Sequence, residues 1–134
     1  MKELNLEYRS SRLEKKSIIL QADFDFNHSS YEEILKKINY IKIKREESQP
    51  LKEKTSGSTF KNPPNKFSAE LIEKAGCKGL QVGGASVSHV HANFIINNGT
   101  ATATDIEKLG RKVIKRVKEM FGITLEWEIK ILGE

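Results

Sequence analysis

The chain has 134 residues, a formal net charge of +5 and 37% hydrophobic residues, which fits one compact domain with a core of its own. Its single cysteine, Cys77, excludes an internal disulfide and any multi-cysteine metal site. No apolar run approaches the roughly 20 residues needed to span a bilayer, and the N-terminal residues lack the apolar stretch of a secretory signal. We therefore expect a soluble, cytoplasmic protein that does not enter a membrane.

The first predicted element is a strand over residues 17–26, SIILQADFDF, where an apolar run passes into alternating phenylalanines and acids. The turn at residues 27–30 then leads into a helix cap. Glu32 and Glu33 stand in the first helical turn, where the helix dipole favours negative charge. Apolar residues at helical spacing continue this helix to about residue 45; they are Ile34, Leu35, Ile38 and Ile41.

Residues 46–67 form a long polar connection with no predicted element of its own, and such loops are usually functional or disordered. Within it, GSTFKNPP at residues 57–64 ends in two prolines that forbid helix and central strand. The same stretch offers the polar side chains of Ser58, Lys61 and Asn62. This loop is therefore the first candidate for binding a ligand.

The second half of the chain mixes helices and short strands. A short helix is expected over residues 67–76, strands near 80–82 and 93–96, and a long helix over 103–121 that Gly122 ends. In the closing segment, residues 124–132, apolar side chains alternate with Glu126, Glu128 and Lys130, which predicts a half-buried strand with the two carboxylates on the opposite face. Such a mixture indicates an α+β fold.

Positive charge gathers in the long helix, at Lys108, Arg111, Lys112, Lys115, Arg116 and Lys118. A solvated helix face explains such a run, and attraction of a phosphorylated ligand or of nucleic acid is the alternative. The tetrapeptide Gly-Cys-Lys-Gly at residues 76–79 matches the Gly-x-x-Gly clamp of one RNA-binding module, although four residues recur by chance. A small basic α+β RNA-binding module therefore remains an alternative function.

Motifs for other sites are missing from the sequence. The three histidines, His28, His89 and His91, do not form a metal-binding spacing with acids nearby, although His89 and His91 would share one face of a strand. No glycine-rich dinucleotide cradle is present. We expect no metal site.

Five motifs occur in a specific order, and together they cover nearly the whole chain: YRSS at 8–11, QPL at 49–51, GSTFKNP at 57–63, the segment 71–103, and LEWEIKILG at 125–133. In this order they resemble the C-terminal part of the UDP-N-acetylenolpyruvoylglucosamine reductase family, flavoenzymes that make UDP-N-acetylmuramate for peptidoglycan. The resemblance implies an α+β substrate-binding domain over residues 29–134. It also implies that residues 1–28 are the last strands of an FAD-binding domain.

The resemblance further implies roles for single residues. The family's catalytic positions fall on Arg9, Ser58 and Glu128, with Ser58 as the proton donor and the other two polarising the substrate carboxylate. Trp127 departs from the proline that is usual in the family's closing strand. Substrate contacts are expected at Tyr8, Asn62 and His91, and, on charge grounds alone, at Lys44 or Arg45.

The family uses FAD and NADPH and acts on a UDP-sugar. Its flavin-binding segments should precede Tyr8, and nothing in this sequence corresponds to them. We therefore expect either a truncated product or a separate polypeptide that supplies the FAD domain. Whether the isolated chain is active stays open on this reading.

Overall fold

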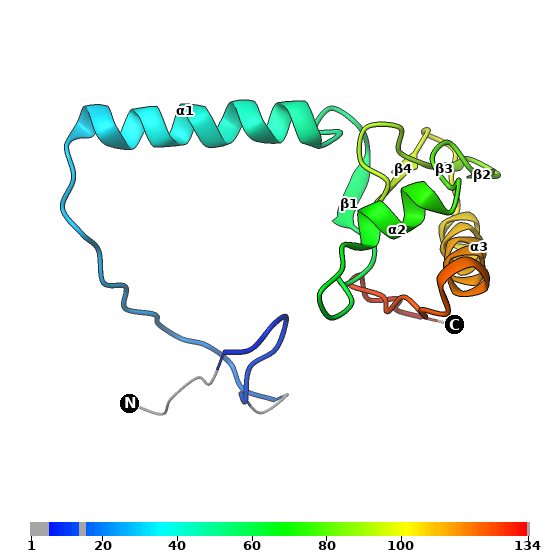
Figure 1. The fold of residues 1–134 in the computed structure, drawn as a ribbon. Coiled ribbons are helices and arrows are strands. Elements are labelled where there is room, and N and C mark those ends of the chain that lie inside the picture. Colours follow the sequence, from blue (N-terminus) through cyan, green and yellow to red (C-terminus); the bar gives the residue numbers. More distant parts are fainter. Residues whose placement is uncertain (1–5, 14–15, 134) are drawn as a thin grey trace. The chain divides into compact units, whose positions relative to one another are not determined.

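The structure, a computed structural model, describes residues 6–13 and 16–133 (Figure 1). The chain divides into two units, Met1–Ile34 and Leu35–Glu134. Between residues 6 and 34, every described residue is exposed to solvent. The core therefore belongs to the second unit.

The strand predicted over residues 17–26 is wrong. This segment has no regular structure, and its large apolar side chains are exposed, with Phe24 at 72% and Phe26 at 85% relative accessibility. A strand forms only where a neighbouring backbone supplies the other half of the hydrogen-bond ladder. Among the described residues of the first unit, the only bridge joins Glu7 and Ser10. Within the part of the chain that the structure describes, the alternating pattern therefore has no partner strand.

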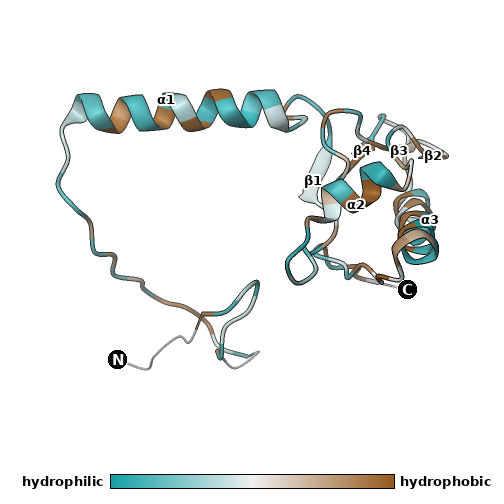
Figure 2. Ribbon diagram, viewed as in Figure 1, coloured by the Kyte–Doolittle hydropathy of each residue, from teal (hydrophilic) through white to brown (hydrophobic). Residues whose placement is uncertain are grey.

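The first helix, α1 (Tyr31–Ser48), is confirmed and runs slightly past the predicted end. It begins at a capping box: the Ser30 Oγ accepts the Glu33 N–H at 3.2 Å, and the Glu33 carboxylate accepts the Ser30 N–H at 3.2 Å. Apolar and polar residues alternate along this helix in Figure 2. None of its residues is buried, so its predicted apolar stripe does not contribute to the core.

The second unit contains a four-stranded antiparallel sheet in the order β1-β4-β3-β2. The strands are β1 (Thr55–Ser58), β2 (Gln81–Val82), β3 (Ala85–Val87) and β4 (Phe94–Asn97). Strands β2 and β4 lie where the sequence predicts them, whereas β1 and β3 were missed. The sequence of β1, TSGS, has no apolar residue to signal a strand, and its structure comes from pairing with β4.

Two helices complete the unit, α2 (Ser68–Lys74) and α3 (Ala103–Phe121), and α3 contacts α2 and three strands of the sheet (Figure 1). Thr102 and Asp105 form a capping box at the start of α3, and Gly122 ends it in the left-handed conformation with φ 70°. The predicted stripe of α3 is buried at Leu109, Val113 and Val117. The core also includes Phe60, Leu71, Ile72, Cys77, Ala85, Val87, Ile95 and Leu125.

The closing segment forms less of a strand than its pattern predicts. Only Trp127 makes a bridge, antiparallel to Phe60. Leu125 is buried, but Ile131 is 50% exposed. The single bridge still joins this segment to the loop after β1. With helices packed on a small antiparallel sheet, the predicted α+β class is confirmed. Among the described residues, no helix combines the length and the apolarity that crossing a bilayer requires.

Candidate functional site

The candidate site is built around the loop that follows β1. Gly57 has a φ of +88°, which glycine adopts without strain, and Ser58 is the last residue of the strand. The next residues pair with the closing segment: the Lys61 N–H donates to the Glu126 carbonyl at 2.9 Å, and the Glu128 N–H donates to the Thr59 carbonyl at 2.9 Å. Ser58 therefore lies directly before a backbone segment that is hydrogen-bonded to Glu128.

Ser58 is half-buried and lines a cavity of about 410 Å³. The wall of this cavity carries one cation, Arg45, and one acid, Glu53. Its other lining residues are Gln49, Pro50, Leu51, Thr55, Gly57 and Phe94. A hydroxyl and a guanidinium on one cavity can together bind an anionic, oxygen-rich ligand.

The two cations proposed on charge grounds differ in the structure. The Nε and Nη2 atoms of Arg45 donate to the Gln49 Oε1 at 3.4 and 3.3 Å, which holds the guanidinium at the cavity. Lys44 instead forms an ion pair with Glu47 at 3.7 Å and lies 5.9 Å from the centre of the Tyr40 ring. Of the two, Arg45 is the cation beside Ser58.

Glu128 is half-buried, and its Oε2 atom is shielded from solvent. In the antiparallel pairing Glu128 stands opposite Thr59, so the two side chains share one face of the ladder while Phe60 and Trp127 share the other. The Thr59 Oγ is also buried and has no hydrogen-bond partner among the described residues. Glu128 is not among the residues that line the cavity at Ser58, and its catalytic role stays a prediction.

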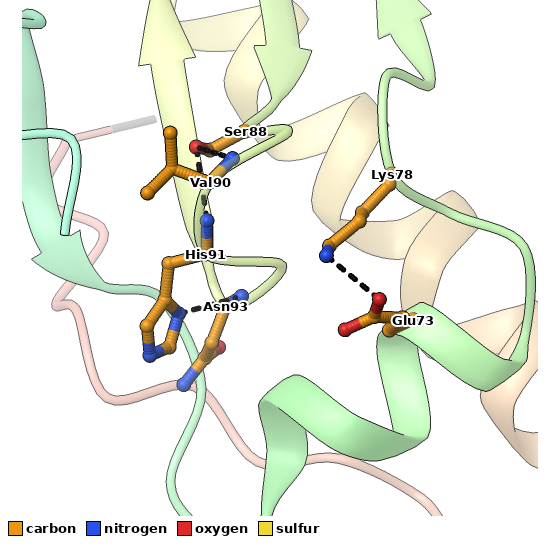
Figure 3. A network of polar contacts seen from close by, with 6 residues as sticks. All are labelled: Glu73, Lys78, Ser88, Val90, His91 and Asn93. Atoms are coloured by element: carbon orange, nitrogen blue, oxygen red, sulfur yellow. Dashed lines mark hydrogen bonds and ion pairs between the residues drawn. The ribbon is translucent and has the colours of Figure 1, made fainter. Parts of the chain in front are cut away.

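His91 lies in the turn between β3 and β4, just before the strand predicted near 93–96, so it does not share a strand face with His89 (Figure 3). The Ser88 Oγ accepts the N–H groups of Val90 at 3.1 Å and His91 at 3.2 Å, which fixes the turn. The His91 Nδ1 accepts the Asn93 N–H at 3.2 Å. A neutral imidazole in this arrangement carries its proton on Nε2 and offers it as a donor.

The imidazole of His91 packs edge-on against the Phe94 ring, with centroids 4.6 Å apart. Burial lowers the pKa of His91 below its usual 6.5, and the Lys78 ammonium acts in the same direction. Lys78 itself is held by the Glu73 carboxylate at 2.7 Å (Figure 3). His91 is therefore kept in its neutral form at neutral pH.

Asn62 has a structural contact that its motif did not reveal. Its Oδ1 accepts the N–H of Ser68, the first residue of α2, at 3.0 Å. The Ser68 hydroxyl in turn donates to the Lys61 carbonyl. The side chain of Asn62 thus joins the Ser58 loop to the start of α2.

Tyr8 and Arg9 belong to the first unit, where they form the tip of a tight turn. The N–H and carbonyl groups of Glu7 and Ser10 bond to each other at 3.0 and 3.2 Å on either side of them. Arg9 has a φ of 56°, and its guanidinium lies 5.3 Å from the centre of the Tyr8 ring. The predicted catalytic role of Arg9 stays a prediction.

Sequence reasoning missed Asn93, which is buried at 4% relative accessibility. Its side-chain amide donates to the Phe60 carbonyl at 2.8 Å and accepts the Phe60 N–H at 3.0 Å. A signal for this role was present in the sequence, because Asn93 stands directly before the apolar run of β4. A polar side chain buried there without a hydrogen-bond partner would cost free energy, so a partner was to be expected.

Metal binding receives no support from the geometry. Over the residues that the structure describes, no three His, Cys, Asp or Glu side chains gather closely enough to hold an ion. Cys77 is buried, and burial raises the pKa of its thiol although Arg116 acts in the opposite direction. That thiol is therefore poorly suited to act as a nucleophile.

Comparison with known proteins identifies the family. The profile of the C-terminal domain of UDP-N-acetylenolpyruvoylglucosamine reductase matches residues 49–132. Proteins with that name from Rickettsia conorii and Novosphingobium aromaticivorans are 52% and 50% identical to this chain over 98% and 99% of its length. These alignments take in 44% and 45% of the two relatives.

A solved structure agrees with the sequence comparisons. The crystal structure of UDP-N-acetylenolpyruvylglucosamine reductase from Thermus caldophilus matches with a TM-score of 0.79 and 40% identity, over 94% of this chain and 45% of that one. The chain thus spans less than half the length of these relatives. By sequence and by fold, it belongs to the UDP-N-acetylenolpyruvoylglucosamine reductase family and corresponds to the C-terminal part of its members.

Proposed function

We propose that this chain is the substrate-binding and catalytic portion of an NADPH-dependent flavoenzyme that reduces UDP-N-acetylglucosamine enolpyruvate to UDP-N-acetylmuramate. The reaction is a cytoplasmic step of peptidoglycan precursor synthesis, on which cell wall biogenesis, cell shape and cell division depend. One observation carries the proposal: Ser58 lines a cavity with Arg45, and the residue after Ser58 is hydrogen-bonded to the backbone of Glu128.

The chemistry explains why a hydroxyl is placed there. Reduction of the enol-ether double bond adds a hydride to the terminal carbon and a proton to its neighbour. The neighbouring carbon carries negative charge that spreads into the substrate carboxylate, so it needs a proton donor and fixed electrostatic stabilisation. In the proposal Ser58 donates the proton, while Arg9 and Glu128 act on the carboxylate.

Binding of the UDP-sugar would use the remaining site residues. Arg45, oriented by Gln49, is the cation for the diphosphate, because a guanidinium binds phosphate oxygens in a fixed planar geometry. His91 offers its Nε2 proton to the sugar nucleotide. Tyr8, Lys44 and Asn62 complete the contacts that the family resemblance and the charge argument suggest.

The helix starts among the described residues do not fit the FAD diphosphate. A helix N-terminus binds phosphate through free backbone N–H groups, but here each helix start has its own acceptor. Glu33 caps α1 and Asp105 caps α3, both with a carboxylate that repels phosphate, and Asn62 accepts a bond at the start of α2. In this proposal the flavin, which would supply the hydride after reduction by NADPH, is held by further polypeptide, in the same protein or in a separate one.

The RNA-binding alternative is not supported. The Gly-x-x-Gly residues are bonded within the fold, since the Gly76 N–H donates to Glu73 and the Gly79 N–H donates to Val87, both at 2.9 Å. On the basic face of α3, Arg111 is paired with Glu107. A solvated helix face accounts for the basic run of α3, and the turn after α2 accounts for the two glycines.

The test restores the flavin half. The chain is fused behind the N-terminal half of the Rickettsia conorii relative, and the two half-reactions are followed separately by flavin absorbance. Ser58→Ala should slow oxidation of the reduced flavin by UDP-N-acetylglucosamine enolpyruvate about 100- to 10,000-fold, the usual loss for a positioned proton donor. Reduction of the flavin by NADPH should be unchanged.

Ser56→Ala is the matched control, because Ser56 lies in the same strand but is exposed and does not line the cavity. It should leave both half-reactions close to wild type. Normal turnover by the Ser58→Ala fusion would remove the proton-donor role. A wild-type fusion that holds flavin but does not reduce the enolpyruvate would overturn the proposed activity of this chain.

A further inference from the structure

Asn93 extends the β1–β4 pairing by one step with its side chain. Within the sheet Ser58 pairs with Phe94, the first residue of β4. One residue further on, the Thr59 N–H donates to the Asn93 carbonyl at 2.8 Å. At Phe60, the next residue, the hydrogen-bond partner is no longer the main chain of β4. The side-chain amide of Asn93 instead binds both the N–H and the carbonyl of Phe60.

The opposite edge of the same segment is occupied by the closing segment. Phe60 forms its bridge with Trp127, and their rings lie 4.9 Å apart. The backbone around Phe60 is therefore held between the Asn93 amide on one side and the residues leading into Glu128 on the other. Because it is anchored on both edges, the position of this backbone sets the register of Glu128 relative to Ser58.

The main chain of Asn93 reaches the third site residue. Its N–H donates to the Nδ1 of His91 (Figure 3), so the neutral ring must carry its proton on Nε2. One residue therefore contacts the segment after Ser58 with its side chain and carbonyl, and His91 with its N–H.

We propose that Asn93 is a positioning residue, which holds Ser58 in register with Glu128 and keeps His91 in the tautomer that donates from Nε2. The inference rests on the proposed function for the roles of those three residues. Only an amide of this length both donates and accepts toward Phe60. An aspartate carboxylate accepts the N–H but opposes the carbonyl, and an alanine leaves both backbone groups of Phe60 without these bonds.

The two hydrogen bonds between the Asn93 side chain and the Phe60 backbone form a clamp. The first experiment measures this clamp by NMR in the 134-residue chain and needs no activity assay. The side-chain N–H₂ protons of Asn93 should exchange with solvent far more slowly than those of the exposed Asn98, since one of them is bonded to a buried carbonyl. The ring ¹⁵N shifts of His91 should report the Nε2–H tautomer. Equal exchange at Asn93 and Asn98, or an Nδ1–H tautomer, would overturn the proposal even if no variant folds.

The second experiment compares Asn93→Ala and Asn93→Asp with Asn97→Ala. Asn97 is a matched control because its Oδ1 also accepts backbone N–H groups, at Gly99 and Ala101, but at the other end of β4. Loss of a buried hydrogen-bond partner should speed amide exchange at Phe60 roughly 10- to 100-fold in the Asn93 variants. In the Asn97→Ala variant, the amide exchange rate of Phe60, measured against the amides of α3 as a reference, should stay at its wild-type value.

In the fusion with a flavin half, both Asn93 variants should lower kcat for enolpyruvate reduction more than they raise KM, because the reacting groups are misplaced after substrate has bound. Asn97→Ala should change neither. An Asn93→Ala variant with wild-type kcat and a locally exposed Phe60 amide would show that the clamp is only structural. An inactive wild-type fusion would instead count against the proposed function, while the NMR result on the clamp would stand.

Discussion

At the scale of single residues, His91 couples the candidate site to pH. Burial holds its folded-state pKa below the usual 6.5, so between the two pKa values the unfolded chain binds more protons than the folded one. The stability that neutral His91 contributes is therefore complete above about pH 6.5 and is lost as the pH falls through the folded-state pKa. The pKa values of Glu33 and Glu70 are lowered from 4.5, so these carboxylates stay ionised at the pH where the loss of stability from His91 begins.

We predict that His91→Gln reduces the fall in unfolding free energy between about pH 7 and pH 5. Glutamine cannot take up a proton in this range, so the variant loses the proton-linked destabilisation. Urea denaturation at several pH values measures the effect. His89→Gln, at an exposed position two residues earlier, should keep the wild-type slope, and an unchanged slope in His91→Gln would show that another group carries the pH dependence.

At the scale of elements, α3 is fitted to the closing segment at one point. Gly110 is buried in the middle of the helix, and a Cβ built there would overlap Cη2 of the Trp127 indole. Glycine costs a helix interior about 1 kcal/mol relative to alanine, so its place here is explained by the indole that occupies the space. Since Trp127 also stacks near Phe60, this contact links α3 to the backbone beside Ser58.

Gly110→Ala should therefore destabilise the protein by about 1 to 3 kcal/mol, the usual range for overpacking, despite the better helix propensity of alanine. Thermal or urea denaturation measures the change. The control is a double-mutant cycle with Trp127→Leu, in which the alanine should cost much less because the smaller side chain leaves room for the methyl group. Additive effects of the two substitutions would show that the indole is not what the methyl group meets.

At the scale of the whole molecule, the core is confined to one part of the chain. Its buried cluster runs from Phe60 to Leu125, whereas all described residues before residue 49 are exposed. The matched family domain begins at residue 49. The apolar side chains of residues 17–26 and of α1 thus add nothing to this core.

We predict that a fragment of residues 49–134 folds cooperatively, with an unfolding free energy within about 1 kcal/mol of the full chain, since the described residues it removes are exposed and the bonds it loses, such as those of Arg45 to Gln49, are on the surface. Urea denaturation followed by Trp127 fluorescence compares the two. The full chain should self-associate more than the fragment, because it exposes the apolar side chains of residues 17–26. A fragment without a cooperative transition would show that α1 is needed for folding.

What the sequence determined by itself was local or carried by motifs. The span and stripe of α3, the cap of α1, the α+β class and the family all followed from periodicity, capping residues and the order of five motifs. These signals are encoded within a few neighbouring residues, because helix caps and hydrophobic stripes act over one or two turns. The candidate residues Ser58 and Glu128 followed from the same motifs.

Only the tertiary structure decided which segments pair. The pattern at residues 17–26 is typical of a strand yet has no partner among the described residues, whereas TSGS in β1 has no strand pattern and pairs with β4. The clamp of Asn93 on Phe60 joins residues 33 positions apart, and no sequence pattern around either residue predicts that they pair. The hydrogen bonds of strands and buried amides are satisfied by residues distant in sequence, so the registers that place Ser58, Glu128 and His91 could be read only from the folded chain.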